Sequence, residues 1–205
     1  MDSIDKELNI AKLSALQNQI VPHYIVNSLD SVRMKLLMDG QEESAELLRC
    51  LQTSLKTYGF SPDSAITVSQ ELSFLEDTLK LYKFRFLGKL NWTFLIDPET
   101  ENLLIPRFLL QPILENSLRH GLRADMEKPS LQIKIWVCSD DLCLSVSDNG
   151  SGFTESADSR GIGLSNVIER LRLLYGDSFQ MQIESQPGSG TCVTLRLPGK
   201  GGAYI

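Results

Sequence analysis

Apolar residues recur at helical spacing along the first part of the chain, up to Tyr58. At about 100° per residue, one stripe runs through and beyond Pro22 and contains Leu13, Leu16, Ile20, Tyr24, Asn27, Ser31 and Met34. After the turn signal Asp39-Gly40, a second stripe contains Leu47, Leu48, Leu51, Leu55 and Tyr58. The pattern predicts two helices joined by a short loop. It also predicts a kink at Pro22, because a proline inside a helix removes a backbone donor and costs about 3 kcal/mol.

A helical hairpin over residues 1–60 has little apolar surface to bury by itself. Below about 70 residues one core seldom stabilises a fold alone. We therefore expect two copies of the hairpin to pair as a four-helix bundle, which makes the protein a homodimer.

The pattern changes near Ser61, where helical and strand periodicities begin to alternate. Thr67 and Gln70 resemble a capping box that opens a helix, and one face of this helix carries Leu72, Leu75, Leu79, Tyr82 and Phe86. A strand is predicted over 90–97. We expect the next helix to have Pro106 in its first turn and to end near Gly121.

The remaining segments predict a sheet. Residues 131–139 and 141–148 alternate as a hairpin, 161–176 as a helix, and 179–185 with 191–197 as a final strand pair. The second domain, 61–198, is thus predicted as an α+β sandwich, a mixed sheet with helices on one face, and 199–205 as a flexible tail.

Composition narrows the range of partners. The chain has 205 residues, and its hydrophobic content of 42% is ordinary for a soluble globular protein. A net charge of -6 argues against a nucleic-acid surface, which needs clustered Lys and Arg. No apolar run reaches the roughly 18 residues that span a bilayer, and no signal peptide precedes the first helix. Paired C-x-x-C spacing is absent, which disfavours zinc, and we expect buried, reduced thiols at Cys50, Cys138, Cys143 and Cys192.

Three clusters in the second domain carry chemistry. "LLQPILENSLRHG", 109–121, places Asn116, Arg119 and His120 on one helix face, where an amide oxygen suits magnesium and a guanidinium suits phosphate. "DNGSGF", 148–153, puts Asp148 before glycines that let a planar ligand approach, and its carboxylate accepts from an exocyclic amine. "RGIGLSNV", 160–167, opens a helix whose N–H groups suit phosphate. Each cluster alone is more often a turn or a helix start, but the three in this order favour a nucleotide site.

These clusters resemble the N, G1 and G2 boxes of the gyrase, Hsp90, histidine kinase and MutL superfamily, in the order "ENSLRHG", "DNGSGF" and "RGIGLSNV". Upstream, "PHYIVNSL" approximates the phosphoacceptor motif P-H-F-x-[FY]-N-x-L of sensor histidine kinases of the LytS and YesM type. The resemblance covers about residues 13–198. It implies a Bergerat-type sandwich behind the helical hairpin, and it assigns 1–60 to dimerisation and phosphotransfer and 61–198 to ATP binding.

The resemblance also implies roles for single residues. His23 is the expected phosphoacceptor, and Asn27, one helical turn further on, is placed to orient the imidazole or a water. Asn116 is expected to hold Mg²⁺ and Asp148 to read the adenine amine. The expected ATP-binding set is Asn116, Arg119, His120, Asp148, Gly150, Gly152, Gly161, Gly163, Leu164 and Thr191.

Two departures limit what the resemblance assigns. Tyr24 follows His23 where other histidine kinase families have a carboxylate, so no general base is identified. Val21 and Val26 also differ from the usual Asn and aromatic residue of the motif.

The function expected from these motifs is ATP-dependent autophosphorylation of His23, followed by phosphoryl transfer to an aspartate of a response regulator. A membrane sensor region would precede this segment, which would then lie on the cytoplasmic side of the membrane. The alternatives are an ATPase of the same fold or a nucleotide-binding interaction module. Hydrolysis is disfavoured because Pro112 stands where such ATPases carry a Glu, and Glu115 points about 100° away from Asn116. A module without catalysis would need a broken nucleotide site, and these boxes are intact.

Overall fold

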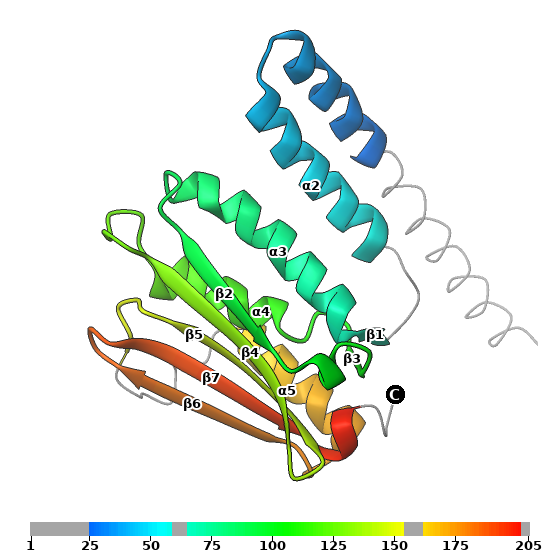
Figure 1. Ribbon diagram of the computed structural model, residues 1–205, viewed down its shortest axis with the longest axis vertical. Helices are drawn as coiled ribbons and strands as arrows, with labels where there is room; N and C mark the ends of the chain where they lie inside the picture. Colours follow the sequence, from blue (N-terminus) through cyan, green and yellow to red (C-terminus); the bar gives the residue numbers. More distant parts are fainter. Residues whose placement is uncertain (1–24, 59–64, 154–161, 202–205) are drawn as a thin grey trace, which may run out of the picture. The chain divides into compact units, whose positions relative to one another are not determined.

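The computed structural model describes residues 25–58, 65–153 and 162–201 (Figure 1). Contacts divide the chain into two compact units, Met1–Pro62 and Asp63–Ile205. The predicted kink at Pro22 lies outside the described residues.

The first unit contains the predicted helical hairpin. A helix over 25–38 and helix α2, Glu42–Tyr58, are joined by a turn in which Gly40 has a φ of 72°. The Gln52 side chain ties the helices together, donating from Nε2 to the Val26 carbonyl at 3.2 Å and to Asp30 Oδ1 at 3.3 Å. The helices therefore run antiparallel, as two helices joined by a short loop must.

Few apolar side chains of this hairpin are buried. Val26, Ala45 and Cys50 are at most 5% exposed, whereas Met34 in the predicted stripe is 47% exposed. Asn27 and Ser31, also in that stripe, are exposed. Val26, the buried residue among the described positions of the first helix, thus lies beside the predicted stripe and not along it.

The second unit begins with a short strand and a long helix. β1, Ala65–Thr67, runs directly into α3, Val68–Arg85. The capping box is confirmed, because Gln70 N donates to Thr67 Oγ1 at 3.2 Å and Thr67 N donates to Gln70 Oε1 at 2.9 Å. The predicted apolar face is confirmed as well, with Leu75, Leu79 and Phe86 at most 1% exposed.

A five-stranded mixed sheet forms the body of this unit. Its strands are β2, Asn91–Ile96; β4, Ser130–Cys138; β5, Asp141–Asp148; β6, Gln180–Gln186; and β7, Gly190–Leu197. The order is β2-β4-β5-β7-β6, with β2 parallel to β4 and every other pair antiparallel. The predicted α+β class with a mixed sheet is confirmed.

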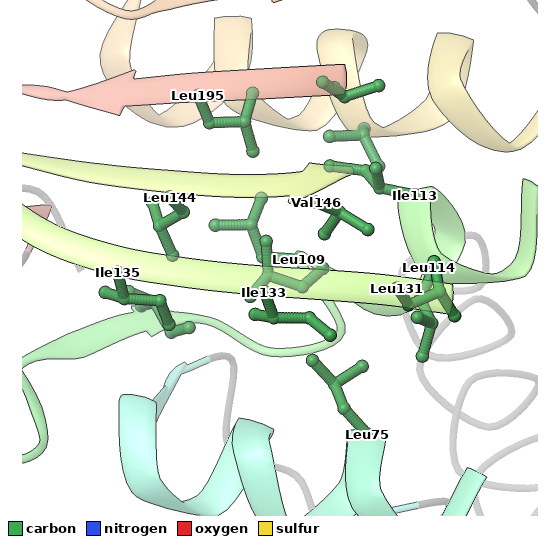
Figure 2. Packing of buried hydrophobic residues seen from close by; sticks show 14 of the residues in the cluster. Leu75, Leu109, Ile113, Leu114, Leu131, Ile133, Ile135, Leu144, Val146 and Leu195 are labelled. Atoms are coloured by element: carbon green, nitrogen blue, oxygen red, sulfur yellow. The ribbon is translucent and has the colours of Figure 1, made fainter. Parts of the chain in front are cut away.

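Alternate residues of the sheet face the helices and build one core. Ile133, Leu144 and Leu195 come from three neighbouring strands and are fully buried. They pack with residues of α3, of α4 (Gln111–Asn116) and of α5 (Ile162–Tyr175). Figure 2 shows Leu75 and Ile113 in one cluster with the strand residues Ile133 and Val146. The core thereby fixes where β5 and α4 end, and both ends carry predicted site residues.

The expected position of Pro106 is wrong. Pro106 ends strand β3, Leu104–Pro106, which pairs antiparallel with β1, and a short 3-10 turn, Pro98–Thr100, precedes it. Phe108 has a φ of 53°, which a right-handed helix cannot contain. The helix therefore starts only at Gln111, with Pro112 in its first turn.

Two smaller predictions also need correction. Cys50 and Cys143 are buried thiols as expected, but Cys138 is exposed where β4 ends, and Cys192 is only partly buried. Residues Pro198–Gly201 form a 3-10 turn at the start of the expected flexible tail, held by a bond from Gly199 N to Asp141 Oδ1 at 3.3 Å.

Candidate functional site

The first cluster lies on α4 and on the π-helical turn that follows it, Ser117–Gly121. Ile113, Leu114 and Leu118 are at most 1% exposed and anchor this segment in the core. The turn is closed by Leu122 N, which donates to the Ser117 carbonyl five residues back at 2.8 Å. Asn116 is half-buried at the junction of the two helical forms, and π turns of this kind are frequent at functional sites.

Arg119 and His120 lie on the exposed side of this turn. Arg119 Nε donates to Tyr82 Oη at 3.4 Å, and Arg119 Nη2 lies 3.7 Å from Glu115 Oε2. The Tyr82 hydrogen bond is the main cause of a raised pKa of Arg119, and Glu115 adds to it. Glu115 also accepts from Gln111 Nε2 at 2.9 Å. The carboxylate of Glu115 is thus engaged by its own helix and by Arg119.

Asp148 is the last residue of β5 and is 8% exposed. Its Oδ1 accepts from Gly150 N at 2.9 Å and from Thr191 N at 3.3 Å. Its Oδ2 is buried and has no hydrogen-bond partner among the described residues. Leaving a buried acceptor unsatisfied costs about 1–3 kcal/mol, so such an atom in a native fold calls for an explanation.

Glycines occupy positions around Asp148 and the β6–β7 turn where a Cβ would overlap neighbouring atoms. A Cβ on Gly150 would lie 2.1 Å from the Gly121 carbonyl oxygen, and one on Gly121 would lie 2.9 Å from both carboxylate oxygens of Asp148. A Cβ on Gly190 would lie 1.9 Å from the Asp148 carbonyl oxygen. Gly152 has a φ of 58°, and its Cβ would lie 2.0 Å from the Gln186 carbonyl oxygen. The end of the first cluster, the second cluster and the β6–β7 turn therefore meet at Asp148.

Thr191 belongs to the same group of residues. It is the register partner of Asp148 across β5 and β7, and its hydroxyl lies 2.9 Å from Ser185 Oγ. Ser185 Oγ also accepts from Phe153 N at 2.9 Å, which ties the end of the "DNGSGF" loop to β6. The hydrogen bonds around Asp148 thus extend through Thr191 and Ser185 into the sheet.

The third cluster is described from Ile162 onward, where α5 begins. A Cβ on Gly163 would make an ordinary contact, 3.6 Å from Pro112 Cβ, so packing within the protein does not require a glycine there. The contact places the start of α5 against the start of α4. Leu164 is 6% exposed and its side chain belongs to the core.

His23 and Gly161 lie outside the described residues, and Asn27 is an exposed residue of the hairpin. The structure therefore gathers Asp148, Gly150, Gly152 and Thr191, and brings the helix that carries Asn116 against the helix that carries Gly163. Sequence reasoning missed Gly190 and the contact that makes Gly121 necessary. The signal for Gly190 was present in the "GSGT" turn, whereas nothing local in the sequence reveals that Gly121 faces Asp148.

Comparison with known proteins assigns the family. A family model described as histidine kinase matches residues 11–90, and one described as histidine kinase-, DNA gyrase B- and HSP90-like ATPase matches residues 105–201. Sensor histidine kinase YesM of Bacillus subtilis strain 168 is 30% identical over 203 residues, which cover 96% of this chain. This chain belongs to the histidine kinase family.

The histidine kinase match extends to further relatives and to the fold. Sensor histidine kinase BtsS of Escherichia coli K12 is 28% identical over 93% of this chain. The chain spans about a third of the length of these relatives, 35% of YesM and 34% of BtsS. The histidine kinase domain of the Erythrobacter litoralis EL346 blue-light activated kinase shares the fold, with a TM-score of 0.52 at 19% identity over 93% of this chain and 94% of that one.

The boundaries of the two family models fit the histidine kinase motifs. The first model includes "PHYIVNSL", and the second includes all three boxes around Asp148. In the residues that the structure describes, every helix is too short or too polar to cross a bilayer.

Proposed function

We propose that this chain is the catalytic core of a sensor histidine kinase. It uses ATP to phosphorylate His23 and passes the phosphoryl group to an aspartate of a response regulator. The observation that carries this proposal is the buried Asp148 Oδ2, an acceptor that lacks a partner among the described residues and lies inside a cradle of glycines. Family membership supports the reaction class, and the geometry at Asp148 supports the proposal that the nucleotide binds there.

The Asp148 carboxylate suits adenine in particular. Oδ1 is held by two backbone N–H groups, so the carboxyl group cannot turn, and Oδ2 is left to accept from the exocyclic amine. Gly121 and Gly150 keep side chains away from the carboxylate. Guanine carries a carbonyl at the corresponding position, and two acceptors facing each other repel. The site therefore favours ATP over GTP.

We assign the binding of the phosphates and Mg²⁺ to residues of α4, of the turn that follows it and of the start of α5. Asn116 is half-buried, and its amide oxygen is a suitable hard ligand for Mg²⁺. Arg119, His120, Gly161, Gly163 and Leu164 complete the proposed set, with backbone N–H groups at the start of α5 facing phosphate. The absence of a packing reason for glycine at 163 supports a ligand at that position.

Transfer to His23 is a nucleophilic displacement. Bound ATP supplies the phosphoryl group: a bond forms from an imidazole nitrogen to the γ-phosphorus as the bond to the β–γ bridging oxygen breaks and ADP leaves. His23 must be neutral at that nitrogen, which an imidazole is near pH 7. Asn27 is proposed to orient the ring or a water from one helical turn away.

We also propose that the hairpin dimerises. The two described helices leave exposed a set of large apolar side chains that comprises Ile25, Val32, Met34, Leu37, Met38 and Leu51. A second copy of the hairpin would cover such side chains in a four-helix bundle. The full-length protein would carry a membrane sensor region before this segment and hold the catalytic core at the cytoplasmic side.

The variant Asp148→Asn tests the adenine proposal. The asparagine side chain keeps one acceptor oxygen but places an amide donor against either the backbone N–H groups or the adenine amine. We expect at least a tenfold loss of ATP affinity by calorimetry, with GTP affinity changed little and the thermal unfolding midpoint close to wild type. Equal ATP binding by the variant would remove Asp148 from the site.

The variant Asn116→Asp tests the metal proposal. The added charge repels the phosphates at short range and disturbs the metal geometry. We expect phosphorylation with Mg²⁺-ATP to fall at least tenfold while the adenine end still binds. Unchanged turnover at subsaturating Mg²⁺ would exclude Asn116 as a ligand.

A further inference from the structure

Glu71 is a fully buried carboxylate outside all three boxes. It lies in the first turn of α3, and its relative exposure is 0%. Its Oε2 accepts from Phe108 N at 3.0 Å and its Oε1 from Leu110 N at 2.9 Å. Leu110 is the residue before the first turn of α4, so a side chain of α3 supplies the acceptor that the start of α4 needs.

The α4 start has no cap of its own. Leu110 occupies the capping position and has no side chain that accepts a hydrogen bond. Each carboxylate oxygen of Glu71 meets one N–H of the 108–110 segment, and the Gln111 N–H adds a further, weaker influence on its pKa. One side chain of α3, Glu71, therefore fixes the start of the helix that carries Asn116 by hydrogen bonds to its backbone.

Phe108 also connects the 108–110 segment to α5. Its carbonyl accepts from Arg170 Nη2 of α5 at 3.1 Å, and its ring meets Phe74 of α3 edge-on with centroids 5.1 Å apart. The left-handed φ of 53° at Phe108 is thus fixed from three sides, two of them polar. Such strain persists only where the surroundings determine it.

The charges around Glu71 are few. Burial raises the pKa of Glu71 to about 6, while backbone N–H groups and the more distant Arg170 lower it. Burial lowers the pKa of Arg170, and Glu71 opposes that shift. Arg107, in the same segment, is buried with its guanidinium 5.8 Å from the Phe108 ring centroid. The segment between β3 and α4 is thus held by a buried carboxylate and flanked by the buried Arg107 and the partly buried Arg170.

We propose that Glu71 is a positioning residue for the nucleotide site: its carboxylate holds the start of α4 against α3 and so sets the place of Asn116. This inference rests on the proposed function for its effect on ATP, but not for its effect on α4. A purely structural role would change stability alone, whereas positioning changes α4 order and nucleotide affinity in a folded protein.

The experiment compares Glu71→Gln with Glu71→Asp and with Glu76→Gln in the full chain. Gln keeps the size of Glu but turns one acceptor into a donor that faces a backbone N–H. Asp keeps the charge but is one methylene shorter. Glu76 is about half exposed on the same helix and pairs with Lys80 at the surface, so its Gln variant is the matched control.

Two measurements are made on each variant. Amide hydrogen exchange without nucleotide reports the order of residues 108–116, and calorimetry reports the affinity for Mg²⁺-ATP. In Glu71→Gln we expect exchange at 108–116 to accelerate at least tenfold, exchange in β4 and β5 to stay as in wild type, and ATP affinity to fall about tenfold. Glu76→Gln should match wild type in both, and Glu71→Asp should lie between the two.

The outcomes separate this inference from the proposed function. Unchanged exchange at 108–116 in Glu71→Gln would overturn the inference whatever ATP does. Faster exchange there with unchanged ATP affinity would reduce Glu71 to a structural residue and also overturn it. A wild-type chain that fails to bind ATP would overturn the proposed function, while local exchange would still decide whether Glu71 holds α4.

Discussion

The two units differ in how much of their apolar side-chain surface they bury within themselves. In the second unit, leucine, isoleucine and valine side chains from three helices and the sheet meet in one core, and Ile133, Leu144 and Leu195 are fully buried within it. In the described part of the hairpin, Val26, Ala45 and Cys50 are the buried apolar residues, and twice as many large apolar side chains are exposed. We therefore expect the second unit to fold as a monomer, and we propose that the hairpin pairs with another copy that covers its exposed apolar side chains. This difference supports the proposal that the second unit binds nucleotide and the hairpin dimerises.

The largest expected effect comes from separating the units. A chain that begins at Ser61 should be a folded monomer that binds ATP, because its core is complete without the hairpin. The full chain should be a dimer. Light scattering checks the masses and calorimetry checks nucleotide binding. A stable dimer of the shorter chain would contradict the claim that the hairpin alone is responsible for dimerisation.

The two units also differed in how well their sequence predicted them. In the second unit, strand alternation and the Thr67–Gln70 capping box placed α3 and the sheet correctly, because these signals are local and the core enforces them. The three-residue strands β1 and β3 carry no such signal, and Pro106 suited a helix start as well as a strand end. In the hairpin, helical spacing predicted the elements, but Met34 of the predicted stripe is exposed within a single chain, so only the dimer can test which face is buried.

In the site, too, local sequence signals were predictable and long-range contacts were not. The boxes were readable because glycines and Asp148 occur in short runs, and Asp148, Gly150 and Thr191 do lie together. The role of Glu71 was not readable, since an acidic residue in the first turn of a helix usually lies in solvent. Only the fold reveals that this carboxylate is buried against the start of α4.

A smaller effect should follow from crowding in the second unit. In Gly150→Ala the new methyl group would overlap the Gly121 carbonyl, so the loop must shift away from Asp148. We expect ATP affinity to fall by about two orders of magnitude, which corresponds to about 3 kcal/mol. The mass of the dimer should not change.

Gly163→Ala is the steric control, because its methyl group fits beside Pro112 without displacing backbone. Thermal unfolding of the two variants should differ accordingly, with a loss of stability in Gly150→Ala alone. Equal ATP affinity of Gly150→Ala and wild type would contradict the crowding argument.

The smallest expected effect is a pH dependence of stability in the second unit. The folded pKa of Glu71, about 6, lies above its ordinary value of 4.5, so the folded state holds the proton more tightly than the unfolded state. The contribution of protonated Glu71 is fully present below pH 4.5 and is lost as the pH rises through 6, a change of about 2 kcal/mol.

Denaturant unfolding of wild type and Glu71→Gln from about pH 4 to about pH 7.5 measures this change. The Gln side chain cannot titrate, so the stability of wild type relative to the variant should decline by about 2 kcal/mol over that range. Glu76→Gln should keep the decline that wild type shows, because its Glu71 still titrates. A difference between wild type and Glu71→Gln that is constant with pH would show that Glu71 titrates alike in both states.

The most direct test of the account is to map the phosphoryl group. The full chain is incubated with Mg²⁺ and γ-labelled ATP, and the acid-labile, base-stable label is located by peptide mapping. We predict label on His23 alone, no label on His23→Gln although it binds ATP normally, and no label on the chain that begins at Ser61. Label of equal yield on His23→Gln would contradict the claim that the hairpin histidine receives the phosphoryl group from the nucleotide site.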